Sequence, residues 1–129
     1  MKAAHDPSSM RDADVAIHSN ALEGRKIAVG ITGGIAATES IRLCRELRRH
    51  GAEITVLMTT AATKIITPLA VGWASQSEII HDWDPEMAQL ESFDGILVAP
   101  ASRNFLSRYV AGMMDNPLLM ACSTGRARG

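Results

Sequence analysis

Three short stretches of small and hydroxyl-bearing residues are the parts of this chain best suited to chemistry. Each follows an apolar run directly: Thr32-Gly33-Gly34, Thr59-Thr60, and Pro100-Ala101-Ser102 with Asn104. Glycine has no Cβ, so the backbone can turn tightly there and approach a bound group. Hydroxyl groups, and the free N–H groups at the start of a helix, suit an anion, usually a phosphate. These residue types predict a site for a phosphate-bearing ligand.

The glycine turn is not decisive by itself. It is neither G-x-G-x-x-G nor a Walker A loop, because no Gly-Lys-Ser/Thr follows it. A tight link between a strand and a helix, with no ligand, explains Gly33 and Gly34 equally well. The two interpretations differ in whether the fold brings the three stretches together.

The elements that would position these stretches can be read from the apolar pattern. Four apolar runs predict strands, at residues 26–30, 53–58, 77–80 and 94–99. Apolar residues recur at a period near 3.6 over residues 35–50 and predict the main helix, whose arginine-rich opposite face is interpreted as solvated. Strand, helix and strand with short links predict a right-handed βαβ unit and a doubly wound α/β fold. With the strand order 3-2-1-4, the first and last stretches flank the point where the order reverses, which is where ligands bind in such sheets.

Shorter helices complete the expected fold. They are predicted at residues 61–66, from Thr67-Pro68 to about residue 74, at 105–111 and at 117–122, with a polar tail over 123–129. Residues 1–24 are polar and are interpreted as an N-terminal extension, so that residues 25–129 form the one domain that a chain of 129 residues suggests.

Composition limits the function classes. The net charge of −1 gives no electrostatic reason to expect a nucleic-acid partner. Cys44 and Cys122 have neither metal-ligand nor disulfide-framework spacing, which favours a reducing compartment and a cytoplasmic protein. No apolar run reaches the roughly 18 residues that would span a membrane, and no signal peptide is recognised. Acidic residues alternate over 82–86 without the glycine turn of a calcium loop, so no metal is predicted.

Five motifs in this order resemble the homo-oligomeric flavin-containing cysteine decarboxylases. This family includes phosphopantothenoylcysteine decarboxylase and peptide cysteine decarboxylases, and the flavin prenyltransferases share its fold. The motifs are Gly30-Ile31-Thr32-Gly33-Gly34-Ile35-Ala36-Ala37, Val56-Leu57-Met58-Thr59 with Ala61-Ala62-Thr63, Ile66-Thr67-Pro68-Leu69, Ile96-Leu97-Val98-Ala99-Pro100-Ala101-Ser102 with Asn104, and Gly112 followed by Asp115-Asn116. The resemblance covers about residues 25–122 and implies a Rossmann-like, flavodoxin-like sheet in a three-layer α/β/α arrangement.

The resemblance also implies the cofactor FMN and the residues that would hold it. These are Thr32, Gly33, Gly34, Thr59, Ala101, Ser102 and Asn104. Asn104 is also the implied catalytic residue, because its amide can hydrogen-bond the flavin ring or a substrate carboxylate. In such relatives FMN oxidises a terminal cysteine to a thioaldehyde-like species, CO2 leaves and an enethiol forms. The implied partners are therefore a peptide or small molecule ending in cysteine, and further copies of the chain in a trimer or a multiple of trimers.

Two departures from the family pattern keep other functions open. Relatives carry an active-site His where this chain has Gln89, and glutamine cannot exchange a proton near neutral pH. His81 is close in sequence, but its position does not match. Relatives also continue into another strand and a substrate clamp beyond Gly129, so the chain is interpreted as a fragment or a shortened protein that ends after the fourth strand. An FMN-binding protein without catalysis is the alternative, and a prenyltransferase-like protein is a third option, although Gly33-Gly34-Ile35 is closer to the decarboxylase turn.

Overall fold

A four-stranded parallel sheet forms the centre of the molecule. The computed structural model describes residues 13–81 and 93–128. The strands are β1 (Lys26–Ile31), β2 (Glu53–Met58), β3 (Ile79–Ile80) and β4 (Gly95–Val98), in the order β3-β2-β1-β4. All three pairings are parallel, with Gly30 aligned with Leu57 on one side and with Val98 on the other. The predicted strands and their order are confirmed, and β1 and β4 lie on either side of the predicted ligand-binding point.

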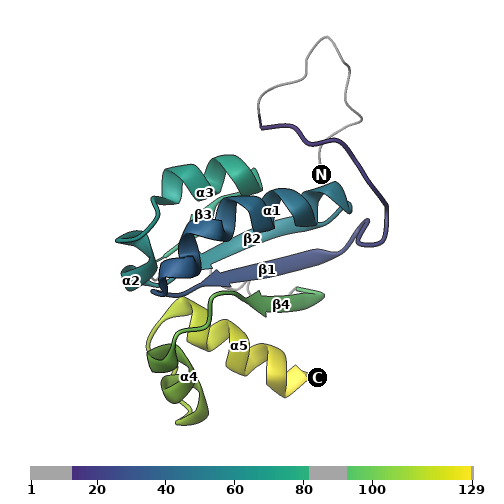
Figure 1. The fold of residues 1–129 in the computed structure, drawn as a ribbon. Coiled ribbons are helices and arrows are strands. Elements are labelled where there is room, and N and C mark those ends of the chain that lie inside the picture. Colours follow the sequence, from purple (N-terminus) through teal and green to yellow (C-terminus); the bar gives the residue numbers. More distant parts are fainter. Residues whose placement is uncertain (1–12, 82–92, 129) are drawn as a thin grey trace.

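Helices cover both faces of this sheet (Figure 1). The elements are η2 (Ile35–Glu39), α1 (Ser40–Arg49), α2 (Thr60–Thr63), α3 (Pro68–Ser75), α4 (Arg103–Val110) and α5 (Pro117–Arg128). In Figure 1 α1 and α3 lie on one side of the sheet, and α4 and α5 lie on the other. The predicted three-layer, doubly wound arrangement is therefore confirmed. None of the described helices is long and apolar enough to cross a membrane.

Each face of the sheet has its own apolar core. Alternate residues of a strand point to opposite faces, so Val29 and Ile31 pack with Cys44 of α1, whereas Ala28 packs with Leu118 of α5. The second face brings α5 unusually close to β1, because a Cβ on Gly30 would overlap the side chain of Leu118. Gly30, the last residue but one of β1, thus allows α5 to pack this closely against the sheet.

The structure differs from the sequence expectation at several helix ends: α2 stops at Thr63 instead of residue 66, and α4 begins at Arg103 instead of residue 105. The predicted helix over 35–50 begins with a turn of 3-10 helix, η2, in which the Ala37 N–H donates to the Gly34 carbonyl at 2.9 Å. The predicted polar tail over 123–129 is wrong, because α5 continues to Arg128. Gly125 permits this continuation beneath the sheet, since a Cβ there would lie 2.9 Å from Cδ1 of Ile96.

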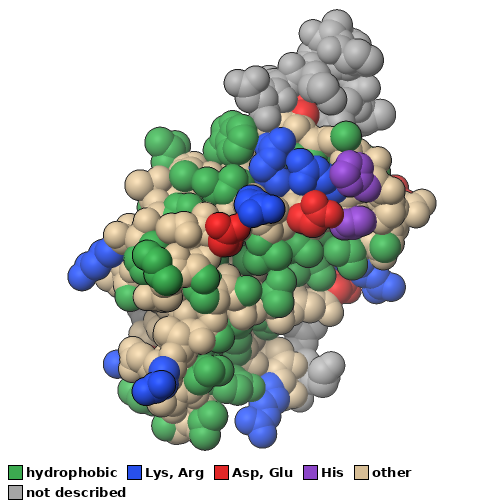
Figure 2. Space-filling model, in the orientation of Figure 1, with side chains coloured by type: hydrophobic (Ala, Val, Ile, Leu, Met, Phe, Trp, Pro, Cys, Tyr) green, Lys and Arg blue, Asp and Glu red, His purple; other side chains and the backbone are tan. Residues whose placement is uncertain are grey.

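The described part of the N-terminal extension packs along α1. Ala13 and Val15 are buried, and Arg48 donates to the carbonyls of Ala13 at 2.7 Å and Ala74 at 3.0 Å. Arg45 lies 4.9 Å from the centre of the Trp73 ring. Figure 2 shows Arg, Glu and His side chains gathered over α1. The arginine-rich face of this helix is thus only partly solvated, because two of its arginines bind neighbouring segments.

Candidate functional site

The three stretches predicted to form a site meet at the carboxyl edge of the sheet. A Cβ on Gly33 would lie 2.5 Å from the Ala61 Cβ in α2, and one on Gly34 would lie 3.4 Å from Pro100. The glycine turn therefore sits between the first turn of α2 and the loop that follows β4. Gly33 does not adopt a positive φ. Its missing side chain is explained by the closeness of α2 rather than by backbone conformation.

Thr32 joins the glycine turn to the loop after β4. Its hydroxyl donates to the Pro100 carbonyl at 2.5 Å and accepts from the Ser102 N–H at 2.7 Å. Its own N–H donates to the same Pro100 carbonyl at 3.3 Å. The peptide bond between Ala99 and Pro100 is cis. Only 1% of Thr32 is exposed, so its side chain lies inside the junction between the two loops.

Two other hydroxyls of the predicted set begin helices. Thr59 Oγ1 accepts from the Ala62 N–H at 3.2 Å at the start of α2, and Ser102 Oγ accepts from the Phe105 N–H at 3.1 Å at the start of α4. A hydroxyl has one donor besides its acceptor lone pairs. Within the described residues, no group accepts from either hydroxyl. Each of the two therefore keeps a donor for a ligand, while Thr32 does not.

Backbone donors at the glycine turn are available as well. No group in residues 13–81 or 93–128 accepts from the N–H groups of Gly33, Ile35 and Ala36, whereas the Gly34 N–H donates to the Thr32 carbonyl at 2.9 Å. Ile35 and Ala36 form the first turn of η2, which continues into α1, so the positive end of the helix dipole lies at the turn. Such N–H groups and a helix start are the usual receptor for a phosphate.

The remaining predicted residues lie on the same loop or outside the described residues. Ala101 and Asn104 are exposed, and Asn104 is in the first turn of α4. Gln89, the suspected replacement of a catalytic His, lies outside the described residues. His81 is exposed and directly follows β3, also at the carboxyl edge. The prediction missed Ala61, whose small side chain after Thr59 was the available signal for close packing against a glycine.

Asn116 has a structural role that the motif alone did not reveal. Its Oδ1 accepts from the Leu119 N–H at 2.8 Å and so caps α5. The neighbouring Asp115 carboxylate accepts from Arg108 of α4 at 2.6 Å. The Asp115-Asn116 motif therefore caps α5 and links its start to α4.

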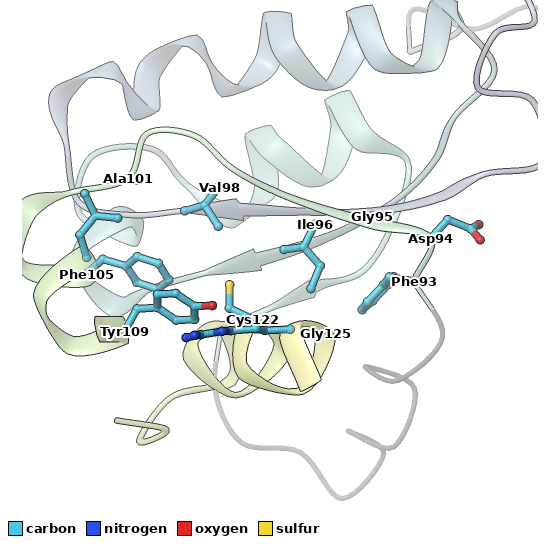
Figure 3. Close-up of a pocket in the computed structure, with 12 residues that line it drawn as sticks. Phe93, Asp94, Gly95, Ile96, Val98, Ala101, Phe105, Tyr109, Cys122 and Gly125 are labelled. Carbon is cyan, nitrogen blue, oxygen red and sulfur yellow. The ribbon is translucent and has the colours of Figure 1, made fainter. Parts of the chain in front are cut away.

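A cavity lies elsewhere among the described residues, beside β4. It has a volume of about 630 Å³ and lies between β4, α4 and α5. In Figure 3 Phe105 and Tyr109 of α4 and Cys122 of α5 lie around it, below Ile96 and Val98 of β4. Ala101 is its only lining residue from the predicted set. The walls of this cavity are mainly apolar, whereas the backbone and hydroxyl donors without an acceptor among the described residues lie at and beside the glycine turn.

The two cysteines carry no sign of reactivity. Burial raises the pKa of the Cys44 thiol to about 11, against a smaller lowering by Arg48, and burial also raises the pKa of Cys122. Both thiols are therefore held protonated at neutral pH, whereas nucleophilic cysteines have a lowered pKa. Among the described residues, no group of three or more His, Cys, Asp or Glu side chains could hold a metal ion.

Comparison with known proteins decides the family. The Flavoprotein family matches residues 15–127. The chain belongs to this family. This confirms the relation that the five sequence motifs suggested.

Curated relatives and solved structures agree with this assignment. The coenzyme A biosynthesis bifunctional protein CoaBC of Thermococcus kodakarensis is 36% identical over 119 residues, which cover 87% of this chain and 30% of that protein. CoaBC of Haemophilus influenzae is 40% identical over 109 residues, which cover 78% and 27%. The chain thus spans less than a third of these relatives.

Two solved structures show the same fold. The FMN-dependent cysteine decarboxylase SpaF superimposes with a TM-score of 0.75 at 22% identity, over 81% of this chain and 65% of that one. The peptidyl-cysteine decarboxylase EpiD has a TM-score of 0.67 at 24% identity, over 78% and 64%. The Flavoprotein family chain therefore has the fold on which these decarboxylases are built.

Proposed function

We propose that this chain binds FMN and takes part in the oxidative decarboxylation of a peptide or small molecule that ends in cysteine. The observation that carries the proposal is the meeting of Gly33-Gly34 with the start of α2 and with Pro100 in the loop before α4, on a chain of the Flavoprotein family. The relatives supply the substrate class by their names, which include CoaBC, the peptidyl-cysteine decarboxylase EpiD, and a PPC decarboxylase mutant complexed with pantothenoylaminoethenethiol.

The residues at the turn fit the phosphate of FMN. The N–H groups of Gly33, Ile35 and Ala36 and the hydroxyls of Thr59 and Ser102 are donors without an acceptor in the described chain. An anion needs donors, and the helix dipole at η2 adds a favourable field, so no cationic side chain is required. Ala101, between Pro100 and Ser102, completes the set of residues that we assign to the cofactor.

Asn104 is the residue that we assign to the reaction. When bound, FMN supplies the two-electron oxidation that precedes loss of CO2 in this class of reaction. Asn104 is exposed two residues beyond Ser102, and its side chain makes no hydrogen bond with another described residue. Its amide offers two donors and an acceptor, enough to hold a substrate carboxylate in place. Its expected role is orientation, which matters because misplacement of the reacting group slows reactions strongly.

One observation favours an FMN-binding protein without catalysis. Gln89 stands where the decarboxylases carry a His, and an amide cannot act as a general acid or base.

A prenyltransferase-like function has weaker support. A UbiX protein solved with FMN and dimethylallyl pyrophosphate has a TM-score of 0.68 at 24% identity, but Gly33-Gly34-Ile35 resembles the decarboxylase turn.

A paired binding and turnover experiment tests the proposal. Purified protein is titrated with FMN, then incubated with phosphopantothenoylcysteine and with cysteine-ended peptides, and loss of CO2 is followed by mass spectrometry. Asn104→Ala should lower turnover about 10²-fold, as expected when a contact that strengthens in the transition state is lost, and should leave FMN binding nearly unchanged. Ser107→Ala, on an exposed residue of the same helix, is the matched control.

Each result has a distinct meaning. A parent protein that takes up no FMN would refute the proposed function altogether. A parent that binds FMN but releases no CO2 from any of these substrates would favour the non-catalytic alternative, with Gln89 as its cause. Full turnover by Asn104→Ala would remove Asn104 from the reaction.

We also propose that the protein is a homo-oligomer, built on trimers, in the cytoplasm. Several large apolar side chains are strongly exposed, among them Ile35 at 80%, Leu69 at 85% and Val110 at 81%. Exposed apolar surface of this kind favours association, and a stable interface buries about 800 Å² per partner. A strict monomer in light scattering at micromolar concentration would contradict the oligomer.

A further inference from the structure

We infer that Thr32 is a positioning residue, which places Ser102 against the glycine turn and makes no contact with the cofactor itself. This inference rests on the proposed function, because it concerns how the FMN site is held together. It differs from the role that family resemblance implies for Thr32, which is direct binding of FMN.

The hydrogen-bonding capacity of the side chain supports this role. An anionic phosphate oxygen needs a donor, and a threonine hydroxyl has only one. The hydroxyl hydrogen of Thr32 is already donated to the Pro100 carbonyl at 2.5 Å, and one lone pair accepts from the Ser102 N–H at 2.7 Å. What remains is an acceptor lone pair, which a phosphate would repel. With 1% of the residue exposed, the side chain is also out of reach of a ligand.

The same contacts explain why a hydroxyl is needed at this position. Beyond the paired strands, the backbone ladder between β1 and the β4 segment continues with the Ala99 N–H, which donates to the Gly30 carbonyl at 2.9 Å. Pro100 has no N–H to offer. Thr32 supplies the next hydrogen bonds. Its N–H and its hydroxyl both donate to the Pro100 carbonyl, and its hydroxyl oxygen accepts from the Ser102 N–H. The side chain thus replaces the backbone ladder where proline interrupts it.

The consequence for the site is the placement of Ser102. The Ser102 N–H is held by Thr32, and the Ser102 Oγ caps α4 through the Phe105 N–H at 3.1 Å. These two bonds fix both the backbone and the side chain of Ser102, and so direct the remaining hydroxyl donor. Loss of the Thr32 hydroxyl would free the Ser102 backbone, leave the Ser102 N–H without a partner among the described residues, and leave the Pro100 carbonyl with only the longer bond from the Thr32 N–H at 3.3 Å.

Three variants test this role. Thr32→Val keeps the shape of the side chain and removes its hydroxyl, and Thr32→Ser keeps the hydroxyl. Ile54→Ala removes a buried side chain near the start of β2, away from the carboxyl edge, and controls for general destabilisation. The measurements are FMN affinity by quenching of flavin fluorescence, thermal unfolding without FMN, and hydrogen exchange of the Ser102 amide by NMR in the FMN-free protein.

The expected results separate positioning from direct contact. Thr32→Val should weaken FMN binding about tenfold or more, the size of one lost hydrogen bond, and should speed Ser102 amide exchange. Thr32→Ser should remain within about twofold of the parent in both, and Ile54→Ala should lower the melting temperature with FMN affinity unchanged. Ser102→Ala should weaken binding less in the Thr32→Val background than alone, because both changes act through one donor.

Contrary outcomes are equally clear. Unchanged Ser102 exchange in Thr32→Val, or additive effects of Thr32→Val and Ser102→Ala on FMN affinity, would overturn the inference. If Thr32→Val shows no cooperative unfolding, Thr32→Cys replaces it, because a thiol of similar size is a weaker donor and acceptor. Absence of FMN binding by the parent would refute the proposed function and the cofactor role of this junction, whereas the exchange measurement would still report on the link between Thr32 and Ser102.

Discussion

Replacing Gly33 with Ala should push α2 away from the glycine turn, and the structure shows which atoms would collide. The new Cβ would lie 2.5 Å from the Ala61 Cβ, while the next atom, the carbonyl carbon of Ala61, is 3.4 Å away. The overlap is therefore with one methyl group. Backbone strain does not contribute, because Gly33 is not among the glycines with positive φ.

The magnitude follows from this single overlap. Overpacking by one methyl group destabilises a well-packed contact by about 1–3 kcal/mol. For a chain of this size, each kcal/mol lost from the free energy of unfolding lowers the melting temperature by about 3–5 °C. Ala61→Gly alone should cost about 1 kcal/mol through helix propensity. In the double variant Gly33→Ala with Ala61→Gly, one methyl group is added at residue 33 and the methyl group it would overlap at residue 61 is removed. We therefore expect roughly the stability of Ala61→Gly alone.

Thermal unfolding of the FMN-free protein, followed by circular dichroism, measures this cycle. Gly34→Ala is the matched control, because its Cβ would lie 3.4 Å from Pro100, an ordinary contact, and it should change stability by less than about 0.5 kcal/mol. A Gly33→Ala protein that melts like the parent would refute the close packing of α2 on the turn. So would a double variant whose loss equals the sum of the two single losses.

Two further predictions concern Ser102 and Cys44. Ser102→Ala should lower FMN affinity about tenfold through the lost donor and destabilise the protein by about 1 kcal/mol through the lost cap of α4, whereas Ser107→Ala should do neither in fluorescence titration and thermal unfolding. Burial raises the pKa of Cys44 from 9.0 to about 11, so the folded state holds this proton more tightly than the unfolded state. The stability from this proton is therefore complete below pH 9 and falls by about 2–3 kcal/mol as the pH rises to 11. Urea unfolding at several pH values should show this decline in the parent and a weaker one in Cys44→Ala.

The sheet was predictable because its signals are local and its connections are constrained. The β-branched runs that became β1 and β2 are separated by one amphipathic helix, and a right-handed crossover leaves few other arrangements. The capping pair Thr67-Pro68 also predicted its helix correctly, with Thr67 accepting from the Ala70 N–H at 3.1 Å. This prediction succeeded because the sequence signal depends on the same local hydrogen bond that the structure contains.

What the sequence could not predict depends on contacts between distant segments. The end of α5 has no amphipathic pattern, and its continuation to Arg128 is explained by the closeness of Gly125 to Ile96 in β4. The role of Thr32 is of the same kind. A threonine after a strand is equally consistent with a ligand contact and with a structural bond, and only its placement against the loop 70 residues later separates the two.

The helix-capping hydroxyls show that closeness to the glycine turn, and not residue type, identifies the candidate site. Thr59, Thr67 and Ser102 each accept a hydrogen bond from the third residue of a helix start. By sequence and by local geometry the three are equivalent, and each could offer its remaining donor to a ligand. They differ in their neighbours, because the atoms nearest to Gly33 belong to the helix that Thr59 caps, and those nearest to Gly34 belong to Pro100, two residues before Ser102. A phosphate held by the N–H groups of the glycine turn would therefore lie beside Thr59 and Ser102, so Thr67→Ala should weaken α3 without changing FMN affinity.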